Sequence, residues 1–316
     1  MTSYRRLGAA LLVLMLWVAG CSSSSDSGEG TDFAPYVDVT GTHTSLSALA
    51  ATTGQKNYVL AFVLAQESSC QASWGGTKTL GDSALLQEIA DLKAQGGSVT
   101  VATGGANGTY LENACSTVDS LVAAYENVLD TVGTNSLDLD IEQSVDVGKV
   151  TQALKQLQDA RGTSIMLTLK VQNASTGLTN DAMELLRAAQ SAGVDVTVNA
   201  MLMNFADTGD WGSDLVTAMS SVETQIRRVW TDLDDDAAYR KLGVTLMIGQ
   251  NDTGQVTTTD VAKTVVAKAH ENDIAFLSFW SVNRDTDGCA GSTTTSGTCS
   301  GVSQSAYEFT NLFRAS

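Results

Sequence analysis

Short apolar stretches alternate with longer stretches of helical periodicity along most of the chain. Between the short stretches, apolar residues recur three and four positions apart, as in 83–95, 118–132 and 260–272, which predicts helices. The first of these follows Asp82 and ends before two glycines, as helices often do. The short stretches are rich in β-branched residues and are followed by turn residues, which predicts eight strands: 33–40, 58–65, 98–103, 137–142, 164–171, 196–203, 243–248 and 275–280.

Strands that alternate with helices indicate a parallel sheet, because parallel neighbours need a crossover connection. Eight strand–helix units in about 280 residues predict an α/β fold of the (β/α)8 TIM barrel type rather than two doubly wound halves. No GxGxxG or GxxxxGK[S/T] phosphate-binding motif follows the first predicted strand, which argues against a nucleotide-binding fold. We therefore expect residues 32–316 to form a single barrel domain.

Residues 1–20 have the pattern of an export signal. Two arginines precede an apolar run over residues 7–18, which is too short to span a bilayer with ease. The letters VAGC that follow resemble a bacterial lipobox, in which the cysteine, Cys21, is lipidated; the alternative is an ordinary signal peptide with a chance cysteine. The polar Ser/Gly stretch 21–31 is typical of a lipoprotein tether. We expect an exported protein, extracellular or anchored to the membrane of the bacterial envelope by a lipid on Cys21.

Export changes what the remaining cysteines indicate. Beyond Cys21 the chain has Cys70, Cys115, Cys289 and Cys299, an even number, which in an oxidising compartment favours two disulfides over metal ligation. No CxxC pair suggests zinc or redox chemistry. Three pairings are possible, and the short separation of Cys289 and Cys299 favours that pair, which leaves Cys70 with Cys115.

The charge and the histidine count argue against nucleic-acid binding and against histidine-based metal sites and nucleophiles. Lys and Arg number 18 against 35 Asp and Glu, for a formal net charge of −17, so nucleic acid is not expected as a partner. With only His43 and His270, a three-histidine metal site is impossible, and a Ser-His-Asp or Cys-His nucleophile would have to use one of them. Neither lies in a supporting motif, and both are expected to face solvent. We expect a monomer with no metal and no cofactor.

The residues with chemical potential concentrate on the fourth predicted strand, LDLDIE over 137–142. Its period of two places Asp138, Asp140 and Glu142 on one face and the apolar residues on the other. The outer face of a barrel packs on helices, so the carboxyl groups must point inward and toward the C-terminal mouth, where barrel active sites lie. Acids stacked roughly 6 to 7 Å apart inside a barrel disfavour ionisation, so one should hold a proton and their pKa values should be coupled.

Three interpretations of this acidic strand compete. A solvated edge strand is the simplest, but an edge strand would not be fourth of eight in a closed barrel. A divalent metal site is the second, but no histidine or further acid cluster completes the coordination. The acid catalyst of a glycosidase is the third, and we favour it, because a carboxyl group with a raised pKa can protonate a leaving sugar oxygen at neutral pH.

The acidic strand resembles the signature of family 18 glycoside hydrolases, the chitinases and their relatives. The letters NSLDLDIE (135–142) are similar to the family's DGxDxDxE, with Asn135 and Ser136 in place of its first Asp and Gly. Other segments resemble weaker motifs of the family in the same order along the chain. These are ATGG (102–105) for SxGG, MLMN (201–204) for MxYD, and MIGQND (247–252) and FLSFWSVNRD (276–285) for the last strands of its bacterial and archaeal branch.

The resemblance implies a retaining mechanism assisted by the substrate, an exception to the two-carboxylate scheme. Glu142 would protonate the glycosidic oxygen, and the substrate's 2-acetamido carbonyl would attack the anomeric carbon to give an oxazolinium ion. Asp140 would orient the acetamido N–H and stabilise the positive charge, and Asp138 would share a proton with Asp140. Water activated by Glu142 would complete hydrolysis. The implied substrate is chitin or another N-acetylglucosamine oligosaccharide.

Two other functions fit the same strand. One is a chitin-binding, lectin-like barrel without turnover, and the presence of Glu142 argues against it because lectin-like relatives usually lack the acid. The other is an endo-β-N-acetylglucosaminidase that cleaves the diacetylchitobiose core of N-glycans, and it would use the same acid motif.

Side chains expected to bind substrate come from the same motifs and from aromatic residues. Trp280 should form the floor of the subsite beside Glu142, because sugar C–H faces pack on indole rings. Met203 replaces the family's tyrosine and cannot donate its hydrogen bond, whereas Asn204 keeps a polar contact without a charge. The further candidates are Tyr36, Gln250, Trp74 and Trp211. The two loop tryptophans could instead pack against their neighbours.

Overall fold

The computed structural model describes residues 1–2 and 31–315. The predicted lipidation site Cys21, and all but the ends of the predicted signal segment and tether, lie outside the described residues. Within the described part of the chain, no helix has the length and apolar character needed to cross a membrane.

Eight parallel strand positions form a closed barrel in the described residues, which confirms the predicted TIM barrel. The first position is divided into β1 and β2 by Ala34 and Pro35; β1 pairs with the last strand and β2 with β3, which closes the sheet. Proline has no N–H to give to a ladder, which is why the strand breaks there. The barrel strands are close to their predicted bounds: β1 Asp32–Phe33, β2 Tyr36–Asp38, β3 Asn57–Ala65, β6 Ser98–Gly104, β7 Ser136–Ile141, β8 Ser164–Asn173, β10 Thr197–Leu202, β11 Leu242–Met247 and β14 Phe276–Trp280.

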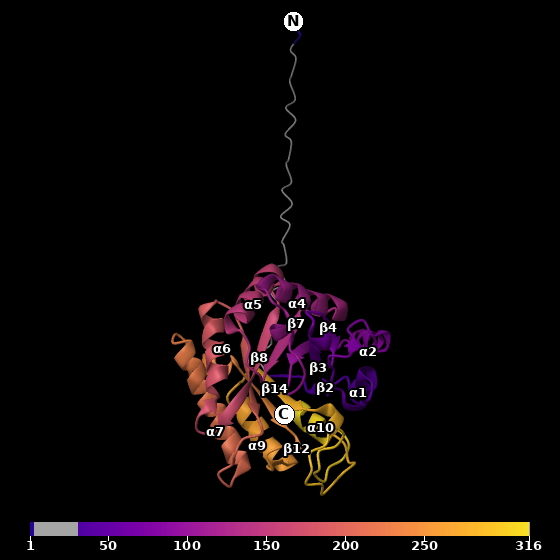
Figure 1. The fold of residues 1–316 in the computed structure, drawn as a ribbon, viewed down its shortest axis with the longest axis vertical. Coiled ribbons are helices and arrows are strands. Elements are labelled where there is room, and N and C mark those ends of the chain that lie inside the picture. The colour runs from indigo at the N-terminus through magenta and orange to yellow at the C-terminus, as the bar shows by residue number, and fades with distance from the viewer. Residues whose placement is uncertain (3–30, 316) are drawn as a thin grey trace.

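Helices cover the outside of this barrel (Figure 1). Their starts follow local sequence signals: Asp82 caps α2 by accepting a hydrogen bond from the Leu85 N–H at 2.9 Å. The helices are α1 Leu46–Thr53, α2 Ser83–Ala94, α3 Leu111–Ala114, α4 Val118–Val132, α5 Val147–Arg161, α6 Asn180–Ser191, α7 Trp211–Val229, α8 Asp235–Tyr239, α9 Thr259–Glu271 and α10 Glu308–Arg314. Short strands in the loops are β4 Ala72–Trp74, β5 Lys78–Thr79, β9 Gly177–Leu178, β12 Gly249–Gln250 and β13 Val256–Thr257.

A layer of hydrogen-bonded polar side chains crosses the barrel interior. Asp138 accepts hydrogen bonds from the Tyr36 hydroxyl at 2.7 Å and the Thr168 hydroxyl at 2.6 Å. The Asn199 amide donates to Thr168 at 2.9 Å and to Thr245 at 2.8 Å. These five residues, which we call the polar layer, come from five different barrel positions, and all are buried. Buried polar groups are tolerated when they are paired, so the polar layer can lie in the barrel interior directly beneath the C-terminal ends of the strands.

Both predicted disulfides are present. Cys70 in the loop after β3 bonds Cys115 at the end of α3, and Cys289 bonds Cys299 within the loop after β14. Each disulfide therefore braces a loop at the C-terminal end of the barrel strands.

Candidate active site

A cavity of about 460 Å³ lies at the C-terminal ends of the barrel strands. This is the end at which TIM-barrel active sites are built. Six of the side chains predicted from the sequence line it: Tyr36, Asp140, Glu142, Met203, Asn204 and Trp280.

The acidic strand β7 lies inside the barrel wall, since it pairs with β6 on one side and β8 on the other. The interpretation as a solvated edge strand is therefore wrong. Asp138 and Asp140 are buried and Glu142 is half-buried, whereas Leu137 and Leu139 are buried on the helix side. The alternation thus points the three carboxyl groups inward and toward the mouth, as expected.

Asp138 is the deepest of the three acids. Burial raises the pKa of its carboxyl to about 7, although the hydrogen bonds from Thr168 and Tyr36 act in the opposite direction. Both carboxyl oxygens accept a hydrogen bond from these two hydroxyls. Asp138 is thus held in one orientation at the base of the site.

Asp140 lies one step higher and faces the cavity. Burial and the charges of Glu142 and Asp138 raise the pKa of its carboxyl well above the ordinary range, with Lys170 acting against them. Its Oδ1 atom is buried and has no hydrogen-bond partner among the described residues. A buried acceptor without a partner suits a ligand that brings a donor. The proton shared between Asp138 and Asp140 stays a prediction.

Glu142 follows the last residue of β7 at the mouth of the barrel. Burial raises the pKa of its carboxyl; the charge of Lys170 opposes this and that of Asp252 adds to it. A carboxyl group with a raised pKa that borders a cavity can deliver a proton to a bound ligand near neutral pH.

Lys170 belongs to the site although none of the sequence motifs indicates it. It lies on β8, and its Nζ donates to the backbone carbonyl of Glu142 at 2.6 Å. A signal was available, since strand alternation places Lys170 on the same inward face as Thr168. A lysine on the inward face of an apolar strand is the cation expected beside buried carboxylates.

The glycines of the ATGG segment allow β6 to approach β7 closely. Gly104 and Gly105 have φ values of 91° and 90°, which side chains rarely adopt. A Cβ atom at Gly104 would lie 2.0 Å from the Asp140 carbonyl oxygen, and one at Gly105 would lie 2.7 Å from the Phe62 ring. Glycine is therefore required at both positions for this packing.

An aromatic and thioether surface forms one wall of the cavity. Trp280 stacks on Phe62 with ring centroids 5.4 Å apart and an angle of 16° between the planes. Met201, Met203 and Met247 form a buried cluster against the same indole. This surface offers the kind of apolar contact that sugar C–H faces need, and the contact of Trp280 and Met203 with a sugar stays a prediction.

Asn204 and Asp252 clamp together two loops at the mouth. The Asn204 amide donates to Asp252 Oδ2 at 3.0 Å, and the Asp252 N–H donates to Asn204 Oδ1 at 2.8 Å. Asn204 has a φ of 57°, in the left-handed region that asparagine tolerates better than most residues. Asp252 lines the cavity, whereas the side chain predicted from the same MIGQND segment is Gln250.

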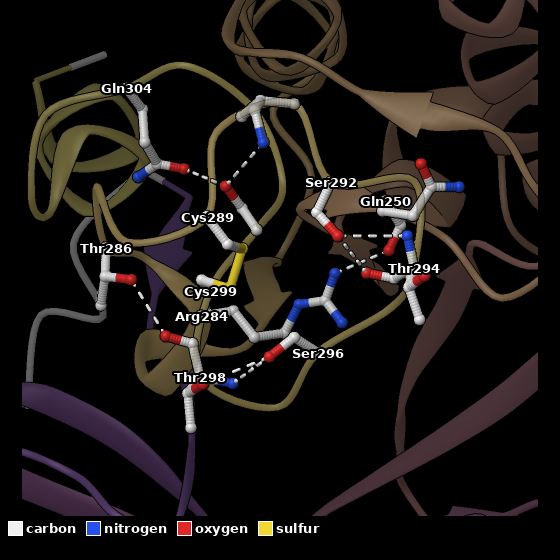
Figure 2. The surroundings of a disulfide bond; sticks show 12 residues. Gln250, Arg284, Thr286, Cys289, Ser292, Thr294, Ser296, Thr298, Cys299 and Gln304 are labelled. Carbon is white, nitrogen blue, oxygen red and sulfur yellow. Dashed lines mark hydrogen bonds between the residues drawn. A yellow bond between two sulfur atoms is a disulfide. The ribbon is translucent and has the colours of Figure 1, made fainter.

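Gln250, which is predicted from the sequence to contact substrate, lies away from the cavity. It is buried outside the cavity lining, and its side chain donates to the backbone carbonyl of Asn251 at 3.2 Å. The backbone carbonyl of Gln250 accepts a hydrogen bond from Arg284 Nη2 at 2.6 Å. Figure 2 shows this hydrogen bond. Burial lowers the pKa of the Arg284 guanidinium to about 10, and the charge of Asp252 opposes this. Gln250 thus belongs to the support of the loop.

Trp74 and Trp211 also lie away from the cavity lining. Trp74 is fully buried in β4, and its indole N–H donates to the Leu80 carbonyl at 3.4 Å. Trp211, at the start of α7, is buried and donates to the Thr257 hydroxyl at 3.0 Å. Both indoles pack against their neighbours, which is the alternative left open above.

The loop closed by the Cys289–Cys299 disulfide contributes residues 295–297 to the cavity lining. Figure 2 shows how hydrogen bonds within this loop, such as that from Thr286 Oγ1 to the Thr298 carbonyl at 2.9 Å, hold it together. The polar wall on this side was not predicted, because the segment has no periodicity to indicate its course.

The remaining candidates add no chemistry to the cavity. His43 and His270, both expected to face solvent, are half-buried, and His43 Nε2 lies 3.3 Å from Glu88 Oε2. Among the residues that the structure describes, no group of three or more His, Cys, Asp or Glu side chains is arranged to hold a metal ion.

A row of inward carboxyl groups that ends at the mouth of a (β/α)8 barrel, beside a stacked tryptophan, defines the class of glycoside hydrolases. The catalytic domain of a hyperthermophilic chitinase from Pyrococcus furiosus is 30% identical, with a TM-score of 0.83, over 91% of this chain and 95% of that domain. The chain therefore belongs to the chitinases of glycoside hydrolase family 18. No known family model matches it.

Curated relatives agree over the barrel but are longer proteins. A probable bifunctional chitinase/lysozyme from Escherichia coli (strain K12) is 28% identical over 81% of this chain. Endochitinase 11 from Metarhizium anisopliae is 28% identical over 80% of this chain. The aligned part makes up 31% of the first protein and 52% of the second.

Proposed function

We propose that this protein is a chitinase that hydrolyses β-1,4-linked N-acetylglucosamine polymers. The observation that carries the proposal is the acidic row on β7, in which Asp138, Asp140 and Glu142 all have a raised pKa and the last two border the cavity. The names of the relatives support this substrate class, and catalytic-site mutants of the Pyrococcus domain are known in complex with chito-oligosaccharides.

In the proposed mechanism, Glu142 donates its proton to the glycosidic oxygen as the bond to the leaving sugar breaks. The 2-acetamido carbonyl of the substrate attacks the anomeric carbon as that bond breaks and forms an oxazolinium ion. Water then attacks the same carbon from the opposite face and opens the ring, so the product has the retained configuration. The partnerless Oδ1 of Asp140 fits the acetamido N–H, and the Asp140 carboxylate stabilises the developing positive charge. Glu142 then takes a proton from the attacking water.

The three acids act as one titrating set. Because the charges of Glu142 and Asp138 raise the pKa of Asp140, a proton kept on either neighbour favours ionised Asp140. When that proton is on Glu142, it can be donated to the leaving group. Protonated Glu142 beside ionised Asp140 is therefore the productive state, and Lys170 stabilises the remaining negative charge.

The proposal is tested with the protein expressed from Ser22 onward, beside Glu142→Gln and, as a matched control, Glu184→Gln on the exposed face of α6. Release from a fluorogenic chitotrioside should fall by at least 10²-fold in Glu142→Gln, since the general acid is lost, and should be unchanged in the control.

Other outcomes would redirect the proposal. If wild type and Glu142→Gln bind chitin equally and neither hydrolyses it, the lectin-like function replaces the catalytic one. Release of N-glycans without cleavage of chitin would instead assign the endo-β-N-acetylglucosaminidase activity.

We also propose that the enzyme is exported, monomeric and anchored through a lipid on Cys21. The lipobox-like segment supports the anchor, and the disulfides Cys70–Cys115 and Cys289–Cys299 fit an oxidising compartment. Labelling with radioactive palmitate should mark the wild-type protein and fail for Cys21→Ser. Labelling of both proteins, or of neither, would refute the anchor.

A further inference from the structure

The β6–β7 ladder ends in an unusual way next to Glu142. The last residue pair is Gly104 with Asp140, after which the Gly105 N–H donates to the Asp140 carbonyl at 2.9 Å. In a parallel ladder the next bond would run from the Glu142 N–H to the Gly105 carbonyl. Instead, the Glu142 N–H donates to the Tyr110 hydroxyl at 3.1 Å, and that hydroxyl donates to the Gly105 carbonyl at 2.5 Å. A tyrosine hydroxyl thus stands in place of one backbone hydrogen bond.

Burial and the neighbouring disulfide hold Tyr110 in this position. It is fully buried and immediately precedes α3, and Cys115, which directly follows α3, is bonded to Cys70. A hydroxyl group can donate its one proton and also accept a hydrogen bond, so the Tyr110 hydroxyl pairs with the Gly105 carbonyl and the Glu142 N–H at once.

The backbone of Glu142 is held by side chains on both of its polar atoms. Pairing with β8 ends at Ile141 and Leu169, so Glu142 lies beyond both ladders. Tyr110 receives its N–H, and Lys170 donates to its carbonyl at 2.6 Å. The location of the Glu142 carboxyl in the cavity therefore depends on two side chains rather than on strand pairing.

We infer that Tyr110 is a positioning residue for the general acid: its hydroxyl is inserted between β6 and β7 and sets where Glu142 presents its proton. This inference rests on the acid role proposed for Glu142. Without the hydroxyl, either β6 and β7 close to a direct bond or the Glu142 N–H and the Gly105 carbonyl stay unpaired. Either change moves the carboxyl, and a misplacement of about 1 Å can cost on the order of 100-fold in rate.

The test compares Tyr110→Phe with Tyr125→Phe. Tyr125 is also fully buried, and its hydroxyl donates to Glu112 Oε1 at 2.7 Å on the helix side, without contact to Glu142. Both substitutions remove one buried hydroxyl, so a purely structural role predicts similar effects. We expect kcat to fall about 10- to 100-fold in Tyr110→Phe with KM within about threefold of wild type, and kcat to stay within about threefold in Tyr125→Phe.

A double-mutant cycle separates positioning from general damage. Added to Glu142→Gln, the Tyr110→Phe substitution should not lower the residual rate further, because there is no acid left to position. Equal losses of kcat in Tyr110→Phe and Tyr125→Phe, or a full additional loss in the Glu142→Gln background, would overturn the inference.

Amide hydrogen exchange gives a readout that does not need turnover. If the Glu142 N–H stays unpaired in Tyr110→Phe, the Glu142 amide should exchange at least about 10-fold faster than in wild type, with no such change in Tyr125→Phe. If β6 and β7 close to a direct bond instead, exchange stays slow but kcat still falls. Unchanged exchange at Glu142 together with an unchanged kcat would overturn the inference. A wild-type protein that cleaves no substrate but shows this difference in exchange would refute the proposed function alone.

Discussion

Replacing Asp138 by asparagine should change how the stability of the protein depends on pH. The Asp138 carboxyl is fully buried, and its pKa rises from an ordinary 3.8 to about 7 because burial penalises the charged form. An asparagine of nearly equal size has no charge to bury. Because its amide has one oxygen instead of two, asparagine can accept a hydrogen bond from only one of the Tyr36 and Thr168 hydroxyls. The free-energy cost of the lost hydrogen bond is the same at every pH.

The sign and size follow from linkage. Below about pH 4 the Asp138 carboxyl is protonated in both the folded and the unfolded chain. As the pH rises toward 7 the unfolded chain releases this proton and the folded chain keeps it, so the folded state loses about 1.4 kcal/mol of stability per pH unit. Between pH 4 and pH 8 the free energy of unfolding of the wild type should therefore fall by about 4 kcal/mol relative to Asp138→Asn. In a domain of this size that corresponds to roughly 10 °C in melting temperature.

Urea unfolding of both proteins at several pH values between 4 and 8 measures this difference. The exposed Asp232, replaced by asparagine, is the matched control, and its difference from the wild type should be nearly flat over the same range. A flat difference for Asp138→Asn as well would refute the reasoning, because it would mean that the Asp138 carboxyl is ionised in the folded state throughout.

Three further changes probe the site. Asp252→Asn should move the alkaline limb of the pH–rate profile to lower pH, because the charge of Asp252 raises the pKa of Glu142; an unmoved limb would contradict this electrostatic role. Trp280→Ala should raise KM for chitotrioside about 10-fold and Trp280→Phe much less, whereas equal KM values would show that the indole is no sugar floor. Gly104→Ala should lower the free energy of unfolding in urea by about 3 kcal/mol or more, since its Cβ would lie 2.0 Å from a carbonyl oxygen. Gly288→Ala is the control, because a Cβ atom at Gly288 would have its nearest neighbour at 3.5 Å, and its urea midpoint should be close to that of wild type. Similar midpoints for Gly104→Ala and Gly288→Ala would contradict the packing argument.

Hydrophobic patterning predicted the barrel and the acidic row because both follow from periodicity. Strand–helix alternation fixes the topology, and the period of two places Asp138, Asp140 and Glu142 on one face before any coordinates are known. Both disulfides could be predicted for a similar reason, since one short separation left a single second pair.

Loop side chains could not be predicted in the same way. Trp74 and Trp211 follow barrel strands, but the sequence does not say whether a loop indole turns toward solvent or toward the core. The sequence could not show that Asp252 rather than Gln250 lines the cavity, because the course of a short hairpin decides which side chain meets it. The insertion of the Tyr110 hydroxyl depends on a mismatch between two strand ends that no local pattern encodes.

The polar layer has a consequence for how the chain finds its native alignment. A slip of one residue in the pairing of β7 or β8 would turn Asp138 or Thr168 from the interior to the helix side, away from its partners. The misaligned barrel would bury an unpaired carboxyl or hydroxyl, which is costly. The hydrogen bonds of the polar layer thus favour one strand register. Because Asp138 also neighbours Asp140, a chain that aligns its strands correctly brings the carboxyl groups of the site together in the same step. Selection for higher stability at this layer would therefore act directly on activity.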